Sequence, residues 1–245
     1  FREELANEVA AADGFDDHFT AAIGDVLLQT TIKHQETELL ASQVTTLGID
    51  ETFWQLDPSR KPPIPEERDR YDHIVINQTL ADELGVKEVG ERVVIRLAAS
   101  NEIPADSPLG RKKDRTNSQQ KQITHIIPNE GLGRFSLSNS QQTPLVAFVW
   151  KKSLQGPSAL DQSGKVNAVI VAGKERDDPA SSDGSELLGK SLQPKLEDYG
   201  LRLETVTYAS TSSTAPSYVN LSSDQLVLPP LVADRVLKEF DESQP

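Results

Sequence analysis

Cysteine and methionine are both absent from this chain of 245 residues. Without cysteine there can be no disulfide, no thiol nucleophile, no thiolate metal ligand and no iron–sulfur cluster. The chain also begins with Phe1 in place of an initiator Met, so we expect a fragment of a longer protein.

Basic residues are scarce relative to acidic ones. The chain has 25 Lys and Arg against 38 Asp and Glu, which gives a net charge of −13 and an isoelectric point near 4.8. A nucleic-acid-binding protein needs a basic face that replaces the counterions of phosphates, and an anionic membrane surface attracts basic segments. The charge therefore argues against both kinds of partner.

Long hydrophobic runs are also missing, although 36% of the residues are hydrophobic and can build a core. The most apolar runs cover 144–150, 166–172 and 226–232, each far short of the ~20 residues that cross a bilayer as a helix. The first eight residues contain three acids and one Arg, unlike a secretory signal. We expect this fragment to be water-soluble.

Hydrophobic periodicity and turn residues predict a mixture of strands and helices. Strands are predicted at 23–32, 44–49, 72–76, 92–97, 122–127, 145–150, 166–172 and 201–207. Four helices are predicted. The first covers 2–12, and the second lies between a cap at Asn77 and a stop at Gly85. The third covers 188–199 with a kink at Pro194, and the fourth lies near the C-terminus around Val232, Val236 and Phe240.

The remaining segments are predicted to be connections. They are a proline-rich crossover at 57–70, a polar loop at 99–121, an acidic loop at 177–184 and a low-complexity stretch at 209–216. The strand, helix and strand between 166 and 207 predict a βαβ unit with its helix on one face of a sheet.

Motifs that carry chemistry are not found. The histidines His18, His34, His73 and His125 have no metal-ligand spacing, and no G-x-S-x-G nucleophile motif occurs. Gly131-Leu-Gly133 lacks the third glycine of a dinucleotide fingerprint, so we interpret it as a loop that needs a positive φ. Acidic pairs such as Asp16-Asp17 and Asp177-Asp178 are interpreted as solvated loop charge. We therefore expect no catalytic residue, no metal and no cofactor.

Three passages together resemble one protein family. They are Gly48-Ile-Asp50-Glu-Thr-Phe53-Trp54, the strand–Asn77–helix–Gly85–Gly90–strand passage of residues 74–96, and residues 126–142 with Gly131, Gly133, Arg134 and Phe135. This set resembles large bacterial permeases of the FtsX-like/MacB-like ABC transporter class, in the extracytoplasmic block after the first transmembrane helix. The resemblance covers about residues 1–230. Glu91, where the family has Asp, and the additional Val89 depart from its pattern.

The resemblance implies an α+β fold with two lobes. A porter-like lobe with a βαβ sandwich would comprise residues 1–65 and 160–245, and a smaller β-rich lobe, 66–159, would be inserted into it. It also implies a non-catalytic domain at the periplasmic face of the bacterial inner membrane. Its partners would be a cytoplasmic ATPase subunit, reached through the missing membrane part, and a periplasmic protein or lipoprotein. The full transporter would be a dimer.

Two other functions stay open from the residues themselves. One is a secreted carbohydrate-active hydrolase, which requires two carboxylates ~5–9 Å apart in a cleft. The other is a β-barrel module that binds a nucleotide-like ligand at the turn between residues 84 and 90, although Glu83, Glu88 and Glu91 make phosphate unwelcome there.

A partner-contact site is predicted at Arg134 and Phe135, because an arginine beside an aromatic residue in a long loop is typical of interface anchors. The alternative is that Phe135 packs into the β-rich lobe and Arg134 pairs with nearby acids.

Overall fold

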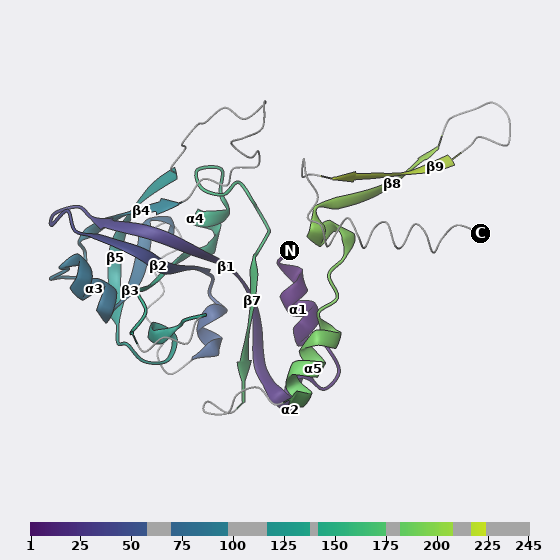
Figure 1. Ribbon diagram of the computed structural model, residues 1–245, viewed down its shortest axis with the longest axis horizontal. Coiled ribbons are helices and arrows are strands. Elements are labelled where there is room, and N and C mark those ends of the chain that lie inside the picture. Colours follow the sequence, from purple (N-terminus) through teal and green to yellow (C-terminus); the bar gives the residue numbers. More distant parts are fainter. Residues whose placement is uncertain (58–69, 98–116, 138–141, 175–181, 208–216, 224–245) are drawn as a thin grey trace. The chain divides into compact units, whose positions relative to one another are not determined.

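The computed structural model describes residues 1–57, 70–97, 117–137, 142–174, 182–207 and 217–223. They form two units, which are described separately (Figure 1). The larger unit lies within Glu3–Ser100 and Lys113–Leu192, and the smaller one comprises Phe1–Arg2 and the described residues from Gln193 onward. The mixture of helices and strands confirms the α+β class, whereas the lobes 1–65 with 160–245 and 66–159 stay a prediction.

The larger unit is organised around a seven-stranded sheet. Its strands are β1 (Phe19–His34), β2 (Leu40–Ile49), β3 (His73–Asn77), β4 (Arg92–Leu97), β5 (Asn117–Ile127), β6 (Val146–Trp150) and β7 (Ala168–Gly173). The order β2-β6-β3-β5-β4-β1-β7, with an additional β1–β2 pairing, closes six strands into a barrel. Closure leaves these six strands without free edges.

Strand β1 is long enough to belong to two structures. Its C-terminal half pairs with β2 and β4 in the barrel, and its N-terminal half, Phe19–Asp25, pairs antiparallel with β7. The first half of β1 and β7 form a two-stranded ribbon that runs out of the barrel beside α1 (Glu4–Ala10) and α5 (Ser182–Ser191) (Figure 1).

Two hydrophobic cores lie on opposite faces of the strands. Along β6, Ala147 and Val149 belong to the first core with α3 (Gln78–Leu84) and Leu154, while Val146 and Phe148 belong to the second. Burial on both faces explains why the sequence of β6 is apolar throughout instead of alternating. A third cluster, around Val9, Phe15 and Phe19, joins α1, α2 (Phe15–His18) and α5 to the ribbon.

The helix α3 forms as its end signals predict. The side chain of Asn77 accepts a hydrogen bond from Leu80 N, and Gly85 ends the helix with φ +67°. The helix predicted at 188–199 is wrong: α5 ends at Ser191, and a separate 3-10 turn, η5 (Leu196–Tyr199), follows Pro194. Proline lacks an N–H and clashes with the preceding turn, so here it breaks the helix instead of bending it.

Two loop predictions also need correction. Residues 117–121, predicted as loop, begin β5, because their backbone pairs with β4 while every second side chain reaches solvent. Residues 182–184, predicted as acidic loop, begin α5. The proline-rich crossover from 58 to 69, the low-complexity stretch and the C-terminal helix lie outside the described residues.

The smaller unit contains η5 and an antiparallel hairpin of β8 (Leu201–Thr207) and β9 (Ser217–Ser223). Asp198 in η5 accepts hydrogen bonds from Arg2 N (2.6 Å) and from the Arg2 guanidinium (3.1 Å). Since β7 pairs with β1 and β8 with β9, the two strands of the predicted βαβ unit belong to different sheets among the described residues.

None of the described helices has both the length and the hydropathy that a bilayer crossing requires.

Candidate functional site

A buried lysine lies at the centre of a polar cluster in the larger unit. Lys151 begins α4 (Lys151–Gln155) directly after β6, and its side chain is 4% exposed. Its ammonium donates to Gly24 O in β1 (3.0 Å) and to Asp50 Oδ2 after β2 (2.5 Å), and it forms an ion pair with Glu3 just before α1. Three protein acceptors account for the three N–H groups of the ammonium.

The sequence Gly48-Ile-Asp50 explains why this lysine can approach. A Cβ atom at Gly48 would lie 2.9 Å from Leu154 Cδ1 and 3.3 Å from Lys151 Cα, so only glycine leaves space for α4. Asp50 then turns the chain, because its Oδ1 accepts hydrogen bonds from Thr52 N (2.8 Å) and Thr52 Oγ1 (2.5 Å).

Electrostatics keep this ion pair charged. Burial alone would lower the pKa of Lys151, but its hydrogen bonds to Asp50 and Glu3 outweigh burial and raise it. Burial alone would raise the pKa of Asp50, but the hydrogen bonds from Lys151 and Thr52 lower it. With a raised pKa and three acceptors, the Lys151 ammonium has no free lone pair of the kind that a nucleophile or general base uses.

Asp25, the neighbour of Gly24 in β1, is the unusual member of the cluster. Its side chain is completely buried, and neither carboxylate oxygen has a hydrogen-bond partner among the described residues. Burial raises the pKa of Asp25 to about 7, with further contributions from Asp50 and Glu3, and the charge of Lys151 opposes the shift.

A depression of about 300 Å³ lies beside this cluster. Its walls include Glu3, Glu4 and Asn7 from the N-terminal segment, Asp50 and Thr52 after β2, and Lys151. The part of the chain that is described contains no group of three or more His, Asp or Glu side chains that could hold a metal ion.

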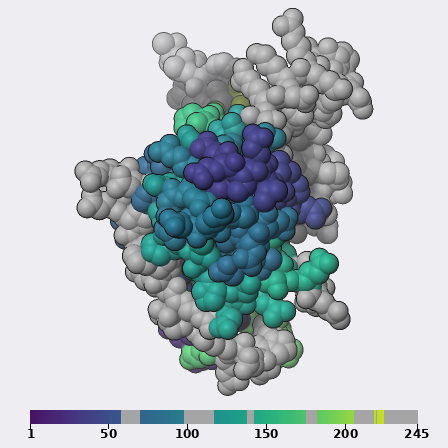
Figure 2. All heavy atoms as spheres, turned by 90° about the vertical axis from the view of Figure 1, so that its left-hand side faces the viewer, coloured from purple at the N-terminus to yellow at the C-terminus, as the bar shows by residue number. Residues whose placement is uncertain are grey.

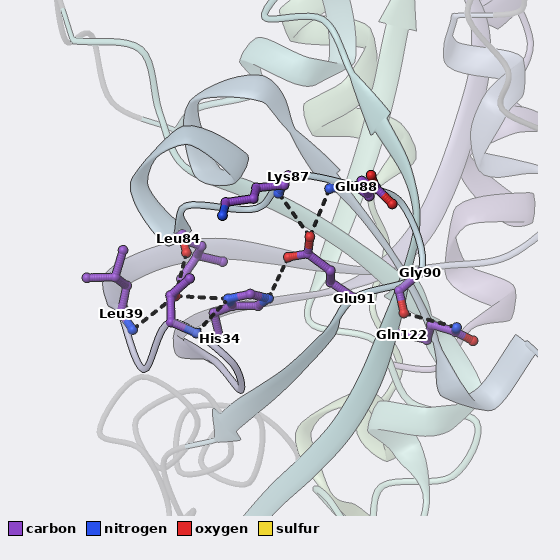
Figure 3. A network of polar contacts seen from close by, with 9 residues as sticks. His34, Leu39, Leu84, Lys87, Glu88, Gly90, Glu91 and Gln122 are labelled. Atoms are coloured by element: carbon purple, nitrogen blue, oxygen red, sulfur yellow. Dashed lines mark hydrogen bonds and ion pairs between the residues drawn. The ribbon is translucent and has the colours of Figure 1, made fainter.

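A second polar network holds the tip of the β1–β2 hairpin (Figure 3). His34 is buried, with its Nδ1 2.9 Å from Thr37 Oγ1 and its Nε2 2.8 Å from Glu91 Oε2. Glu91 Oε1 accepts from the backbone N–H groups of Lys87 (3.1 Å) and Glu88 (2.9 Å). Although burial opposes the change, these amides and the nearby His34 and Lys87 lower the pKa of Glu91.

This network gives a physical reason for the departure at Glu91. The side chain of glutamate is one methylene longer than that of the aspartate in the family pattern. Here it contacts both His34 and the turn that contains Val89. Spacing along the sequence does not reveal Glu91 as the partner of His34, because the two residues lie in different loops.

The three passages that carry the family resemblance meet in the structure. Asn77 makes four hydrogen bonds: its amide donates to Gly133 O (2.9 Å) and Pro144 O (2.7 Å), and its oxygen accepts from Leu80 N and Val146 N (both 3.1 Å). Phe53 and Trp54 of the first passage lie in the second core with Val75 of the second passage and Phe135 of the third. Their rings also pack against Phe148, with centroids 5.6 and 5.4 Å away.

Arg134 and Phe135, the predicted contact residues, have different surroundings. Arg134 is exposed at the end of η4 (Gly131–Arg134), and no ion pair between it and another described residue is found. Phe135 is half-buried and packs against the second core. Of the two glycines nearby, Gly131 has φ +54° as the loop interpretation expects, whereas Gly133 is needed because a Cβ would overlap Pro128 O.

The other histidines occupy separate places. His18 ends α2, and His73 and His125 lie on the neighbouring strands β3 and β5, where Val75 is the register partner of His125. Burial and the proximity of His73 lower the pKa of His125. The proximity of His73 and His125 could not be read from their positions in the sequence.

Comparison with known proteins gives structural neighbours only. No protein-family profile and no curated protein sequence matches the chain. Among solved structures, the periplasmic region of MacB from Actinobacillus actinomycetemcomitans matches with 9% identity and a TM-score of 0.45, over 100% of this chain and 84% of that one. The chain is similar to a MacB periplasmic region.

A second structure is a domain of a permease protein from Porphyromonas gingivalis, with 16% identity and a TM-score of 0.37. The match covers 89% of this chain and 82% of that one.

Proposed function

We propose that this chain is a non-catalytic extracytoplasmic domain of a bacterial ABC transporter permease, located at the periplasmic face of the inner membrane. The observation that carries the proposal is that the three family-like passages share the second core, and that Asn77 of the second passage also bonds to Gly133 of the third. In such a permease the N-terminal segment would follow a transmembrane helix. Lys151, through Glu3, would fix this segment to the barrel and so transmit its movement.

The parent gene provides the first test. We expect apolar runs of ~20 residues on both sides of the encoded segment and an ATPase gene beside it. A complete gene without such runs would refute the proposal.

Coupling through Lys151 can be tested in the full transporter. Replacing Lys151 with Met should reduce transport while ATP hydrolysis by the cytoplasmic subunit continues, because the link between the N-terminal helix and the barrel is lost. Equal loss of transport and ATP hydrolysis, at unchanged protein level in the membrane, would contradict this role.

A dimer of the full transporter should also be recovered after detergent extraction.

Partner contact is proposed at Arg134, with Phe135 fixing the loop through its packing. Arg134→Glu should weaken binding of a periplasmic protein or lipoprotein partner, whereas Arg96→Glu, an exposed arginine on β4, should not. Unchanged transport and binding with Arg134→Glu would remove this site from the proposal.

The hydrolase alternative finds little support at the depression. Glu3 and Asp50 both bond to the same ammonium, and the lowered pKa of Asp50 leaves it without a proton to donate at neutral pH. Hydrolysis of chromogenic glycosides by the purified chain, abolished by Asp25→Asn, would revive this alternative.

A further inference from the structure

Three exposed apolar side chains lie in two neighbouring segments, the tip of the β1–β2 hairpin and the turn after α3. The described part of the larger unit exposes six large apolar side chains, and Leu39 (48%), Leu40 (47%) and Val89 (56%) are three of them. They lie in residues 35–40 and 85–91, which we call the hairpin-tip surface. Figure 2 looks onto this face, where the purple hairpin adjoins the blue segment that contains α3.

The hairpin-tip surface is held rigid from beneath (Figure 3). Besides the contact between His34 and Glu91, Thr37 Oγ1 donates to Leu84 O (2.9 Å) and Gln35 N donates to Arg92 O (3.0 Å). Loops that are already ordered lose little conformational entropy when a partner binds, which favours recognition by a preformed surface.

Charge selects the kind of partner. Residues 33–40 and 82–92 carry six carboxylates and three basic side chains, and Lys33 is already paired with Glu38 (3.0 Å). Glu36, Glu83 and Glu88 are exposed in the same stretches of chain as the three apolar side chains. An acidic rim of this kind attracts Lys and Arg and repels anionic groups.

We propose that the hairpin-tip surface binds a protein segment that presents apolar side chains flanked by Lys and Arg. Two copies of this surface would bring like charges together, and an anionic lipid surface would be repelled, so neither is the occupant proposed. The proposal concerns these two loops alone and does not rest on the transporter function.

A labelled amphipathic Leu/Lys peptide is the probe, and its binding to the purified chain can be followed by fluorescence anisotropy. The triple variant Leu39→Ser, Leu40→Ser, Val89→Ser should weaken binding by at least about tenfold, because the apolar contacts are lost. Glu36→Gln with Glu88→Gln should also weaken it and reduce its salt dependence. A Leu/Glu peptide should not bind.

Matched controls separate this surface from general attraction to an acidic chain. The triple Tyr71→Ser, Leu137→Ser, Leu192→Ser changes the other three exposed apolar side chains in the described part of the larger unit, and Asp16→Asn with Asp17→Asn changes acids elsewhere. Both controls should bind as the wild type does. Equal losses in test and control variants would overturn the proposal.

Two further measurements distinguish loss of the binding surface from misfolding of a variant and from self-association of the chain. Photo-crosslinking of the peptide to the wild-type chain should label residues 36–40 and 86–90, whatever the stability of the variants, and labels spread over the surface would overturn the proposal. A wild-type dimer in sedimentation velocity that the Leu39, Leu40, Val89 triple abolishes would assign the surface to a second copy and would likewise overturn it.

Discussion

Asp25 is a buried carboxyl group that has no hydrogen-bond partner among the described residues and lies near a cation that is fully bonded elsewhere. Its pKa is raised from 3.8 to about 7. Between these values the folded protein keeps a proton that the unfolded chain has released. The free energy of unfolding therefore falls as the pH rises through this range, and this group adds no pH dependence outside it.

Replacing Asp25 with Asn should remove this pH dependence, since the amide does not titrate. Above pH 7 the variant should be more stable than the wild type by roughly 1–3 kcal/mol, because a buried charge is no longer formed. Urea unfolding at several pH values between 4 and 8 measures the effect. Parallel stability curves for the two proteins would contradict it.

Lys151→Met should destabilise the chain by about 2–4 kcal/mol at neutral pH, because it leaves Asp50 and Glu3 without their cation while Asp25 stays buried. Lys33→Met is the matched control: Lys33 pairs with the exposed Glu38, and its loss should cost less than about 1 kcal/mol. Chemical denaturation compares the two variants. Similar costs would mean that the buried cluster contributes no more than a surface pair.

Among the elements, the barrel strands and α3 follow from the sequence, because branched apolar runs and the Asn77 and Gly85 end signals act locally. The Lys151 cluster does not follow from it. Its lysine comes directly after the apolar run of β6, which is a weak sign of burial, but its acceptors lie 101 and 127 residues away at Asp50 and Gly24. Periodicity cannot report such partners.

The loop at η4 offers a test at the level of one element. Gly133→Ala should cost about 2–4 kcal/mol, because the new Cβ would overlap the backbone oxygen of Pro128 and move the loop that Asn77 holds. Gly189→Ala in α5 is the control: nothing lies within 4 Å of its Cβ, and alanine should stabilise the helix by about 0.5–1 kcal/mol. Thermal unfolding measures the stability of both variants. A Gly133→Ala variant as stable as the wild type would show that the loop shifts to make room for the methyl group.

At the scale of the whole molecule, the two units differ in how much core they contain. The larger unit has a closed barrel with two cores, whereas in the β8–β9 hairpin Leu203 and Tyr218 are exposed. A two-stranded hairpin is only marginally stable by itself.

Amide hydrogen exchange should therefore be much faster in β8 and β9 than in the barrel strands β3, β5 and β6. Mass spectrometry of peptic fragments measures this difference in the intact chain. Protection of the hairpin equal to that of the barrel would show that additional contacts stabilise it.

The Lys151 cluster also bears on the order of events in folding. Its acceptors Gly24 and Asp50 lie 127 and 101 residues away, and closing such long loops costs conformational entropy, so we expect its contacts to form late in folding. Contacts that form after the rate-limiting step affect unfolding more than refolding. Removing Lys151 should therefore raise the unfolding rate constant and shorten the lifetime of the folded state, while the refolding rate constant stays nearly unchanged.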